Sequence, residues 1–123
     1  MSERTVLIVE DEADILMSLR IALELADYRV LGVASAEEAL TVFDREAPDA
    51  MLLDIGLPGM DGWTLLEQLQ SDTRRSTLPV IVVSAHADLA SAGRATQLGC
   101  RAFLTKPFRV AELTRALDEV FAS

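Results

Sequence analysis

Near the start of the chain runs the stretch TVLIV, residues 5–9, which has no charged residue and no alternation of apolar with polar side chains. Two later stretches have the same character, AMLL at residues 50–53 and VIVV at residues 80–83. Short runs that are apolar or β-branched throughout are typical of strands buried on both faces. Such strands occur in parallel sheets covered by helices on either side, and these stretches therefore predict the centre of such a sheet.

Two further apolar stretches each carry one arginine, YRVLGV at residues 28–33 and CRAFL at residues 100–104. A charge suits a strand at the edge of a sheet, where one side meets water. Apolar residues at helical spacing predict helices within residues 15–26, 36–47, 65–69 and 113–121, and a weaker helix is predicted over residues 89–98. The pattern predicts an α/β protein, a (βα)5 doubly wound five-stranded parallel sheet in a single domain over residues 1–123. With right-handed crossovers and the arginine-bearing strands at the edges, the strand order is 2-1-3-4-5, the flavodoxin-like arrangement.

Two of the predicted helices have distinctive features. Ser35 and Glu38 form a capping-box pattern at the start of the second helix. The fourth helix, over residues 89–98, is rich in Ala, Ser and Thr, and Gly93 within it costs about 1 kcal/mol relative to alanine. Because that helix has few apolar residues to anchor it, we hypothesise that it is a mobile element.

Composition excludes several kinds of site. The 123 residues carry a formal net charge of −9, and so acidic a surface repels phosphate backbones, so we expect no direct binding of nucleic acid. Cys100 is the only cysteine and His86 the only histidine, which excludes an intrachain disulfide, a cysteine-rich zinc site and a two-histidine metal site. The chain has no long apolar stretch, so we expect no secretory signal, no membrane span and a cytoplasmic location.

The residues that follow the predicted strands carry the chemistry. In sheets of this kind, ligands bind beyond the carboxyl ends of the strands, near the point where strand order reverses. Those ends are followed by Glu10 and Asp11 after the first strand, Asp54 after the third, Ser84 after the fourth and Lys106 close after the fifth. Any one of the acids alone could simply cap the next helix. Together they indicate one shared site at this edge of the sheet.

The charges of these residues indicate a bound divalent cation. Two like charges about 4 Å apart cost roughly 4 kcal/mol at an effective dielectric constant of about 20. Glu10, Asp11 and Asp54 bring three negative charges, which Lys106 and one divalent ion would neutralise. Carboxylate oxygens are hard ligands, so the pattern favours Mg²⁺, with Mn²⁺ as a substitute, over zinc.

Several motifs, taken in order along the chain, resemble those of the response regulator receiver domain family. They are VEDE at residues 9–12, Asp54 followed by LPGMDG at residues 57–62, Ser84-Ala85, and KPF at residues 106–108. The resemblance extends from Thr5 to Phe121. It implies a phospho-accepting signalling domain of a two-component or phosphorelay system. Such a domain is not a conventional enzyme, but it catalyses its own phosphorylation and dephosphorylation.

The resemblance also implies roles for the acidic residues. Asp54 would accept the phosphoryl group from a phosphohistidine of a sensor histidine kinase or a histidine phosphotransfer protein. The side chains of Asp11 and Asp54 and the backbone carbonyl of Gly56 would bind Mg²⁺. Glu10 would act largely through a metal-bound water. These roles agree with the need of phosphoryl transfer for alignment and charge neutralisation.

The remaining site residues would respond to phosphorylation. Lys106 would pair with Asp54 and then with the phosphoryl oxygens, and the bond from Lys106 to Pro107 would be cis. Ser84 would donate its hydroxyl to the phosphoryl group, and Phe103 would be the aromatic switch residue. Their movement would alter the surface of the fourth helix, fifth strand and fifth helix, where a downstream output protein or domain would bind. We expect a monomer or a weak dimer.

Some residues depart from common family patterns or have no assigned role. Glu10 stands where many members have Asp, and its greater length bears on metal affinity. Phe103 stands where many have Tyr, and Arg109 opens the last helix in place of a capping Asp or Ser. His86 lies near the predicted site, where a structural role competes with an effect on phosphoaspartate hydrolysis. Trp63 is expected to pack or to lie at the surface rather than to contact a cofactor.

Three alternatives stay open at this point. A haloacid-dehalogenase-like phosphatase also uses a strand-end Asp with Mg²⁺, but it usually has a second Asp two residues later, where this chain has Gly56. A flavin-binding module would need a phosphate-cradling loop after the first strand, where the acidic residues 10–12 would repel phosphate. A degenerate receiver would only bind partners, although this chain has all the site residues.

Overall fold

The computed structural model describes residues 4–56, 61–72, 77–85 and 89–122. Strands and helices alternate along these residues, as the sequence predicts. The strands are β1 (Thr5–Val9), β2 (Arg29–Val33), β3 (Ala50–Asp54), β4 (Val80–Ser84) and β5 (Ala102–Thr105). The helices are α1 (Ala13–Leu25), α2 (Ala36–Phe43), α3 (Gly62–Ser71), α4 (Leu89–Gln97) and α5 (Val110–Ala122).

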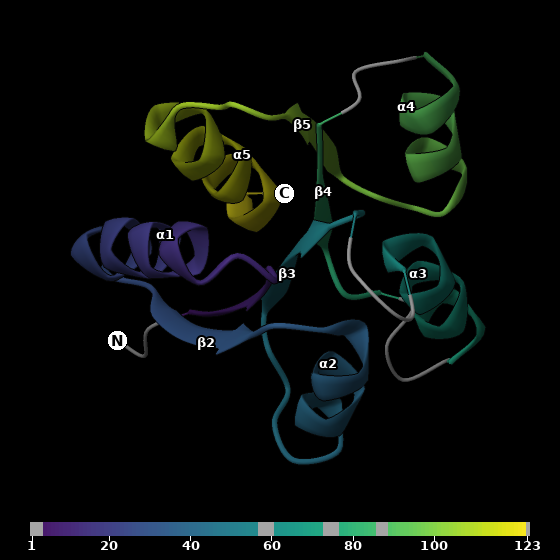
Figure 1. Cartoon of the computed structure of the whole chain (residues 1–123), viewed down its shortest axis with the longest axis horizontal. Helices are drawn as coiled ribbons and strands as arrows, with labels where there is room; N and C mark the ends of the chain where they lie inside the picture. Colours follow the sequence, from purple (N-terminus) through teal and green to yellow (C-terminus); the bar gives the residue numbers. More distant parts are fainter. Residues whose placement is uncertain (1–3, 57–60, 73–76, 86–88, 123) are drawn as a thin grey trace.

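The strands form one parallel sheet in the order β2-β1-β3-β4-β5, which confirms the predicted topology (Figure 1). β3 and β4 are buried along their whole length, and β1 along all but its first residue. Every residue of β5 and most residues of β2 keep some exposure. The uninterrupted apolar stretches therefore mark the central strands, and the stretches with an arginine mark the edges.

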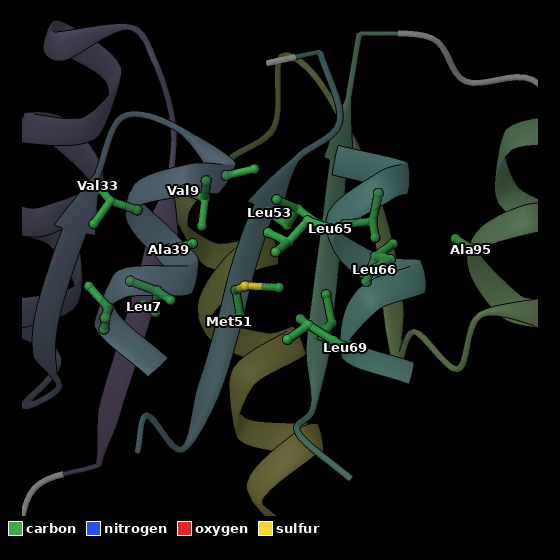
Figure 2. Close-up of a cluster of buried hydrophobic side chains, with 14 residues drawn as sticks. Leu7, Val9, Val33, Ala39, Met51, Leu53, Leu65, Leu66, Leu69 and Ala95 are labelled. Carbon is green, nitrogen blue, oxygen red and sulfur yellow. The ribbon is translucent and has the colours of Figure 1, made fainter. Parts of the chain in front are cut away.

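Helices cover both faces of the sheet and bury an apolar cluster on each. α1 and α5 lie on one face, and α2, α3 and α4 lie on the other (Figure 1). Figure 2 shows the cluster under α2, α3 and α4, where Leu53 of β3 contacts Leu65 of α3. Because neighbouring side chains of a strand point to opposite faces, Leu52 and Leu53 belong to different clusters. The central strands are thus shared by both layers.

Side chains at the helix starts satisfy backbone N–H groups that have no partner within the helix. Ser35 Oγ accepts the Glu38 N–H at 3.1 Å, as the predicted capping box requires. The Glu38 carboxylate accepts the N–H of Ala34 at 2.8 Å, one residue before the position that the pattern predicts. At the start of α5, the Glu112 carboxylate accepts the N–H of Arg109 at 3.1 Å. Glu112, inside α5, therefore caps the start of the helix, where Arg109 has no capping side chain.

Two predicted strands begin later than expected because hydrogen bonds of the preceding helices hold their first residues. The N–H of Tyr28 donates to the carbonyl of Leu23 in α1 at 3.0 Å, and β2 begins at Arg29. The N–H of Cys100 donates to the carbonyl of Ala95 in α4, also at 3.0 Å. The fifth strand therefore begins at Ala102 instead of Cys100.

Other features of the connections follow or correct the prediction. α2 ends at Phe43, so Ala47, predicted to extend its apolar face, is exposed in the connection to β3. The bond between Lys106 and Pro107 is cis, as expected. Within the described parts of the chain, no helix has both the length and the apolar character needed to cross a membrane.

Candidate functional site

The pairing of β1, β3 and β4 places two predicted acids side by side. Val9 of β1 lies opposite Leu53 of β3. The residues that follow them, Glu10 and Asp54, are therefore neighbours at the carboxyl edge of the sheet. Asp54 in turn lies opposite Val83 of β4. This is also the point at which strand order reverses, where ligands bind in sheets of this type.

The pairing of β4 and β5 brings the serine and the lysine to the same edge. Ser84 lies opposite Thr105, and the N–H of Lys106 donates to the carbonyl of Ser84 at 2.8 Å. Ser84 is buried, and it lies one residue beyond the partner of Asp54. The backbone register thus gathers the strand-end residues that the sequence singled out.

Lys106 joins the two buried carboxylates. Its Nζ lies 2.7 Å from Asp54 Oδ2 and 3.1 Å from Glu10 Oε1. Glu10 is 3% exposed and Asp54 is 7% exposed, so little water screens these contacts. Burial favours the neutral amine, but the hydrogen bonds and charges of the two carboxylates outweigh burial and raise the pKa of Lys106. The ammonium form of Lys106 is therefore stabilised where it meets both acids.

Opposing effects act on the pKa of Glu10. Burial raises the pKa of Glu10, and the negative charge of Asp54 adds to that effect. Hydrogen bonds act in the opposite direction, one from Lys106 and one from the Glu12 N–H, which lies 3.1 Å from Glu10 Oε2. Both carboxylate oxygens of Glu10 therefore have donors, and a nearby cation would further favour its charged form.

Asp54 is fixed at both carboxylate oxygens. Oδ2 accepts from Lys106, and Oδ1 accepts the N–H of Gly56 at 2.9 Å. The loop backbone that follows β3 thus turns back onto the carboxylate two residues earlier. Two donors on different oxygens restrict rotation of the carboxylate and fix its orientation at the sheet edge.

Three carboxylates converge into a group that fits a divalent cation. Glu10, Asp11 and Asp54 each offer one oxygen, and these oxygens all lie within 4.8 Å of one another. Oxygen ligands at about 2.1 Å from one Mg²⁺ are about 3–4 Å apart, so small side-chain adjustments would suffice. Asp11 is exposed and the other two are buried, which leaves the group open to solvent on one side. An all-oxygen donor set suits Mg²⁺ or Mn²⁺.

The other predicted residues take different places. Phe103 lies opposite Val82 in the β4–β5 pair and packs, half-buried, against the cluster under α2, α3 and α4. It is therefore on the face of the sheet that carries α4. His86 and residues 57–60 of the loop after Asp54 lie outside the described residues.

Two features near the site were not predicted. A cleft of about 490 Å³ lies beside Lys106 and is lined mainly by apolar side chains of α1, of the connection from β5 to α5 and of the first residue of α5. On the other side of the sheet, the guanidinium of Arg94 in α4 lies 4.6 Å from the ring centre of Trp63 in α3. Trp63 itself packs against the apolar cluster, as expected. Neither feature has a local sequence signal, because each joins separate elements.

Comparisons with known proteins agree on one family. A model of the response regulator receiver domain matches residues 6–118. A crystal structure of a response regulator receiver domain protein from Methanospirillum hungatei has a TM-score of 0.89 and 32% identity, covering 97% of this chain and 94% of that one. The receiver domain of sensor histidine kinase PA1611 from Pseudomonas aeruginosa has a TM-score of 0.89 and 30% identity, covering 99% and 100% of the two chains. That structure has a magnesium ion coordinated in its active site cleft.

Curated relatives include longer transcriptional regulators. The phosphate regulon transcriptional regulatory protein PhoB of Pseudomonas aeruginosa is 34% identical over 117 residues, which are 95% of this chain. The match covers only 51% of PhoB, and the chain spans a similar share, 46–49%, of other matched regulators. The likeness therefore concerns one part of each of those proteins.

Proposed function

Because this chain belongs to the response regulator receiver domain family of two-component signalling, we propose that Asp54 accepts a phosphoryl group from a phosphohistidine, assisted by Mg²⁺ or Mn²⁺. One observation carries the proposal. The buried carboxylate of Asp54, held on one oxygen by Lys106 and on the other by Gly56, is one of three carboxylates whose oxygens lie within 4.8 Å of one another. The donor would be a sensor histidine kinase or a histidine phosphotransfer protein.

The chemical step needs a positioned carboxylate. An Asp54 oxygen would form a bond to phosphorus while the bond from phosphorus to the imidazole nitrogen breaks, and the electron pair of the broken bond leaves with the imidazole. The Gly56 N–H and the Lys106 ammonium hold the carboxylate in one orientation before the donor arrives. Such positioning removes part of the entropic barrier to transfer. Lys106 also provides positive charge for the phosphoryl oxygens.

The acidic cluster supplies the cation site. Asp11 and Asp54 would hold the ion through their side chains and Gly56 through its carbonyl, and Glu10 would act largely through water. The bound cation would supply positive charge that offsets the phosphoryl oxygens and the crowded carboxylates. The oxygen donor set and the magnesium ion of the PA1611 receiver domain support this assignment.

Phosphorylation would then change a binding surface. Ser84 would donate its hydroxyl to the new phosphoryl group, and Phe103 would respond as an aromatic switch in β5. The surface of α4, β5 and α5 would thereby select a downstream output protein or domain. We infer that the same site also catalyses hydrolysis of the phosphoaspartate, and that the chain acts as a monomer or weak dimer without binding nucleic acid directly.

The test is phosphorylation of the purified chain by acetyl phosphate, followed by intact mass spectrometry. The parent is expected to gain one phosphoryl group with Mg²⁺ and none with a chelator, because the cation offsets the charge of the cluster. Asp54→Asn should gain none, and Asp44→Asn, which changes an exposed acid at the end of α2, should behave as the parent does. A gain that persists in Asp54→Asn would contradict the proposal. Sustained turnover of a phosphomonoester would instead favour a phosphatase.

A further inference from the structure

In the part of α4 whose side chains the structure describes, few apolar contacts hold the helix against the rest of the molecule. Among its side chains that the structure describes, Ala95 alone is buried. Its neighbour α3 contributes three buried leucines, Leu65, Leu66 and Leu69. A Cβ added at Gly93 would meet nothing within 4 Å, so α4 is open to solvent there. α4 is therefore the element of this pair that can shift at lower cost in buried surface.

Polar contacts supply part of the attachment of α4 to α3. The Arg94 guanidinium lies over the Trp63 ring, with 4.6 Å from its Cζ to the ring centre. The charge of Arg94 is also one of the causes that lower the pKa of Asp61, after the hydrogen bond from the Thr64 backbone. Just beyond the last residue of α4, the carbonyl of Leu98 accepts a hydrogen bond from the Gln70 side-chain amide of α3. Arg94 thus interacts with the start of α3.

The start of α3 rests directly on the end of the strand that carries Asp54. Gly62, which immediately precedes Trp63, is buried, and its N–H donates to the carbonyl of Ile55 at 3.3 Å. A Cβ at Gly62 would lie 2.8 Å from Ile55 Cα and 3.0 Å from the carbonyl oxygen of Asp54. Only backbone fits between these segments, so the position of Trp63 is fixed relative to Asp54.

We propose that Trp63 and Arg94 form a latch that holds α4 in its unphosphorylated position and opens when Asp54 is phosphorylated. The inference rests on the proposed function and names the contact through which that site controls α4. Trp63 is the fixed half, because α3 is anchored in the core and against β3. Arg94 is the moving half, because it belongs to the weakly anchored helix.

The expected effect of phosphorylation on α4 follows from the order of the elements along the chain. A phosphoryl group on Asp54 adds negative charge and acceptor oxygens beside Ser84, which ends the strand preceding α4. Movement of the Ser84 segment toward Asp54 displaces α4 along α3, and the stacked geometry of Arg94 on Trp63 is lost. Asp54 reacts from the arrangement in which the latch is open, so a contact that favours the closed arrangement lowers the reactive fraction and slows phosphorylation.

The experiment uses Trp63, the only tryptophan of the chain, as its own reporter. Tryptophan emission and intact mass are followed together after addition of acetyl phosphate and Mg²⁺ to the parent and to Arg94→Met. The parent emission is expected to change in step with the phosphoryl gain. Arg94→Met should start with altered emission, change less, and be phosphorylated about two- to fivefold faster, the factor that corresponds to an exposed cation–π contact.

Matched variants separate the latch from general effects of charge and folding. Arg115→Met removes an exposed arginine from α5 and should match the parent in both emission change and rate. Trp63→Leu, followed by mass alone, should also speed phosphorylation, and the double variant Trp63→Leu/Arg94→Met should gain nothing further because both changes remove one contact. Additive gains in the double variant would overturn the latch.

Two outcomes would count against the inference in different ways. Complete phosphorylation of the parent with unchanged Trp63 emission, or equal rates for the parent and Arg94→Met, would overturn the latch and leave the proposed function intact. Absence of any phosphoryl gain in the parent would overturn the proposed function and, with it, the coupling of α4 to Asp54.

Discussion

Glu10 and Asp54 are buried acids that share one ammonium group, and Asp11 adds a third negative charge from an exposed position. A pair of like charges about 4 Å apart costs roughly 4 kcal/mol at an effective dielectric constant of about 20. Lys106 offsets only part of this repulsion. A cation that binds the folded chain should therefore stabilise it.

Mg²⁺ is expected to raise the thermal unfolding midpoint of the parent. A concentration ten times the dissociation constant adds about 1.4 kcal/mol of stability, or roughly 5 °C for a domain of this size. Asp11→Asn removes one proposed ligand and should lose most of that shift. Asp14→Asn removes the same charge from an exposed position three residues later and should keep it. Circular dichroism melts with Mg²⁺ and with chelator give the shift in unfolding midpoint for each variant. Equal shifts in the two variants would rule out Asp11 as a ligand.

The thiol of Cys100 should be inert in the folded chain. Burial raises the pKa of Cys100 to about 12 from an ordinary value of 9.0, so the folded state holds the proton more tightly than the unfolded state. The stability linked to this thiol is fully present below about pH 9 and is lost as pH rises toward about 12. At about pH 8.5, iodoacetamide should modify native Cys100 at least about tenfold more slowly than Cys100 in urea. Similar rates in both states would show that the thiol is not protected.

The residues of the site differ in how far sequence could predict them. Asp54 and Lys106 could be located because each lies at the end of an apolar strand, and parallel strand ends meet at one edge. The contact of Lys106 with Glu10 depends on side-chain reach between strands that are not adjacent in the sheet, and no sequence spacing encodes it. The contact of Arg94 with Trp63 was also not predicted, because it too depends on side-chain reach between separate elements.

Among the elements, α1 and α4 differ in how they are anchored. α1 buries Leu19 and Leu23 against the sheet, whereas Ala95 is the one buried side chain in the described part of α4. Local opening is easiest where few apolar contacts hold a helix. We expect backbone amides of α4 to exchange with deuterium faster than those in the middle of α1, as hydrogen exchange with mass spectrometry would measure. Equal protection of the two helices would contradict the hypothesis that α4 is mobile.

Two glycines at different elements should respond oppositely to replacement by alanine. A Cβ at Gly93 meets no atom within 4 Å, so Gly93→Ala should stabilise α4 by about 0.5–1 kcal/mol through its helix propensity. A Cβ at Gly62 would lie 2.8 Å from Ile55 Cα, so Gly62→Ala should destabilise the chain by about 1–3 kcal/mol. Urea unfolding gives both values, and a loss of stability in Gly93→Ala would show that α4 is packed more closely than the structure indicates.

Element types were predictable where one physical signal dominates. β3 and β4 have no polar alternation because helices cover both of their faces, and their sequences show it directly. Boundaries were less predictable because they depend on partners elsewhere. β3 extends to the buried Asp54, whose charge is compensated by Lys106 from β5's end, and Cys100 is held by α4 instead of joining β5.

At the scale of the whole molecule, the two apolar clusters lie on opposite faces of one sheet and share its central strands. Neither layer of helices can dissociate without exposing one face of β1, β3 and β4, which are buried on both sides. A chain of this length with a shared sheet is expected to unfold in a single cooperative transition. A substitution that destabilises one cluster should therefore also lower the unfolding midpoint of the other.

Leu117→Ala tests this coupling. Leu117 lies fully buried in α5, in the cluster with α1, while Trp63 packs against the cluster on the opposite face. The substitution should cost about 2–5 kcal/mol because it removes buried methyl groups and leaves a cavity. In urea, Trp63 emission and far-ultraviolet circular dichroism should report the same lowered midpoint. Leu25→Ala, the same change at a side chain that is 81% exposed, should leave both midpoints nearly unchanged. A Trp63 midpoint that stays at the parent value while circular dichroism shifts would mean that the two layers unfold independently.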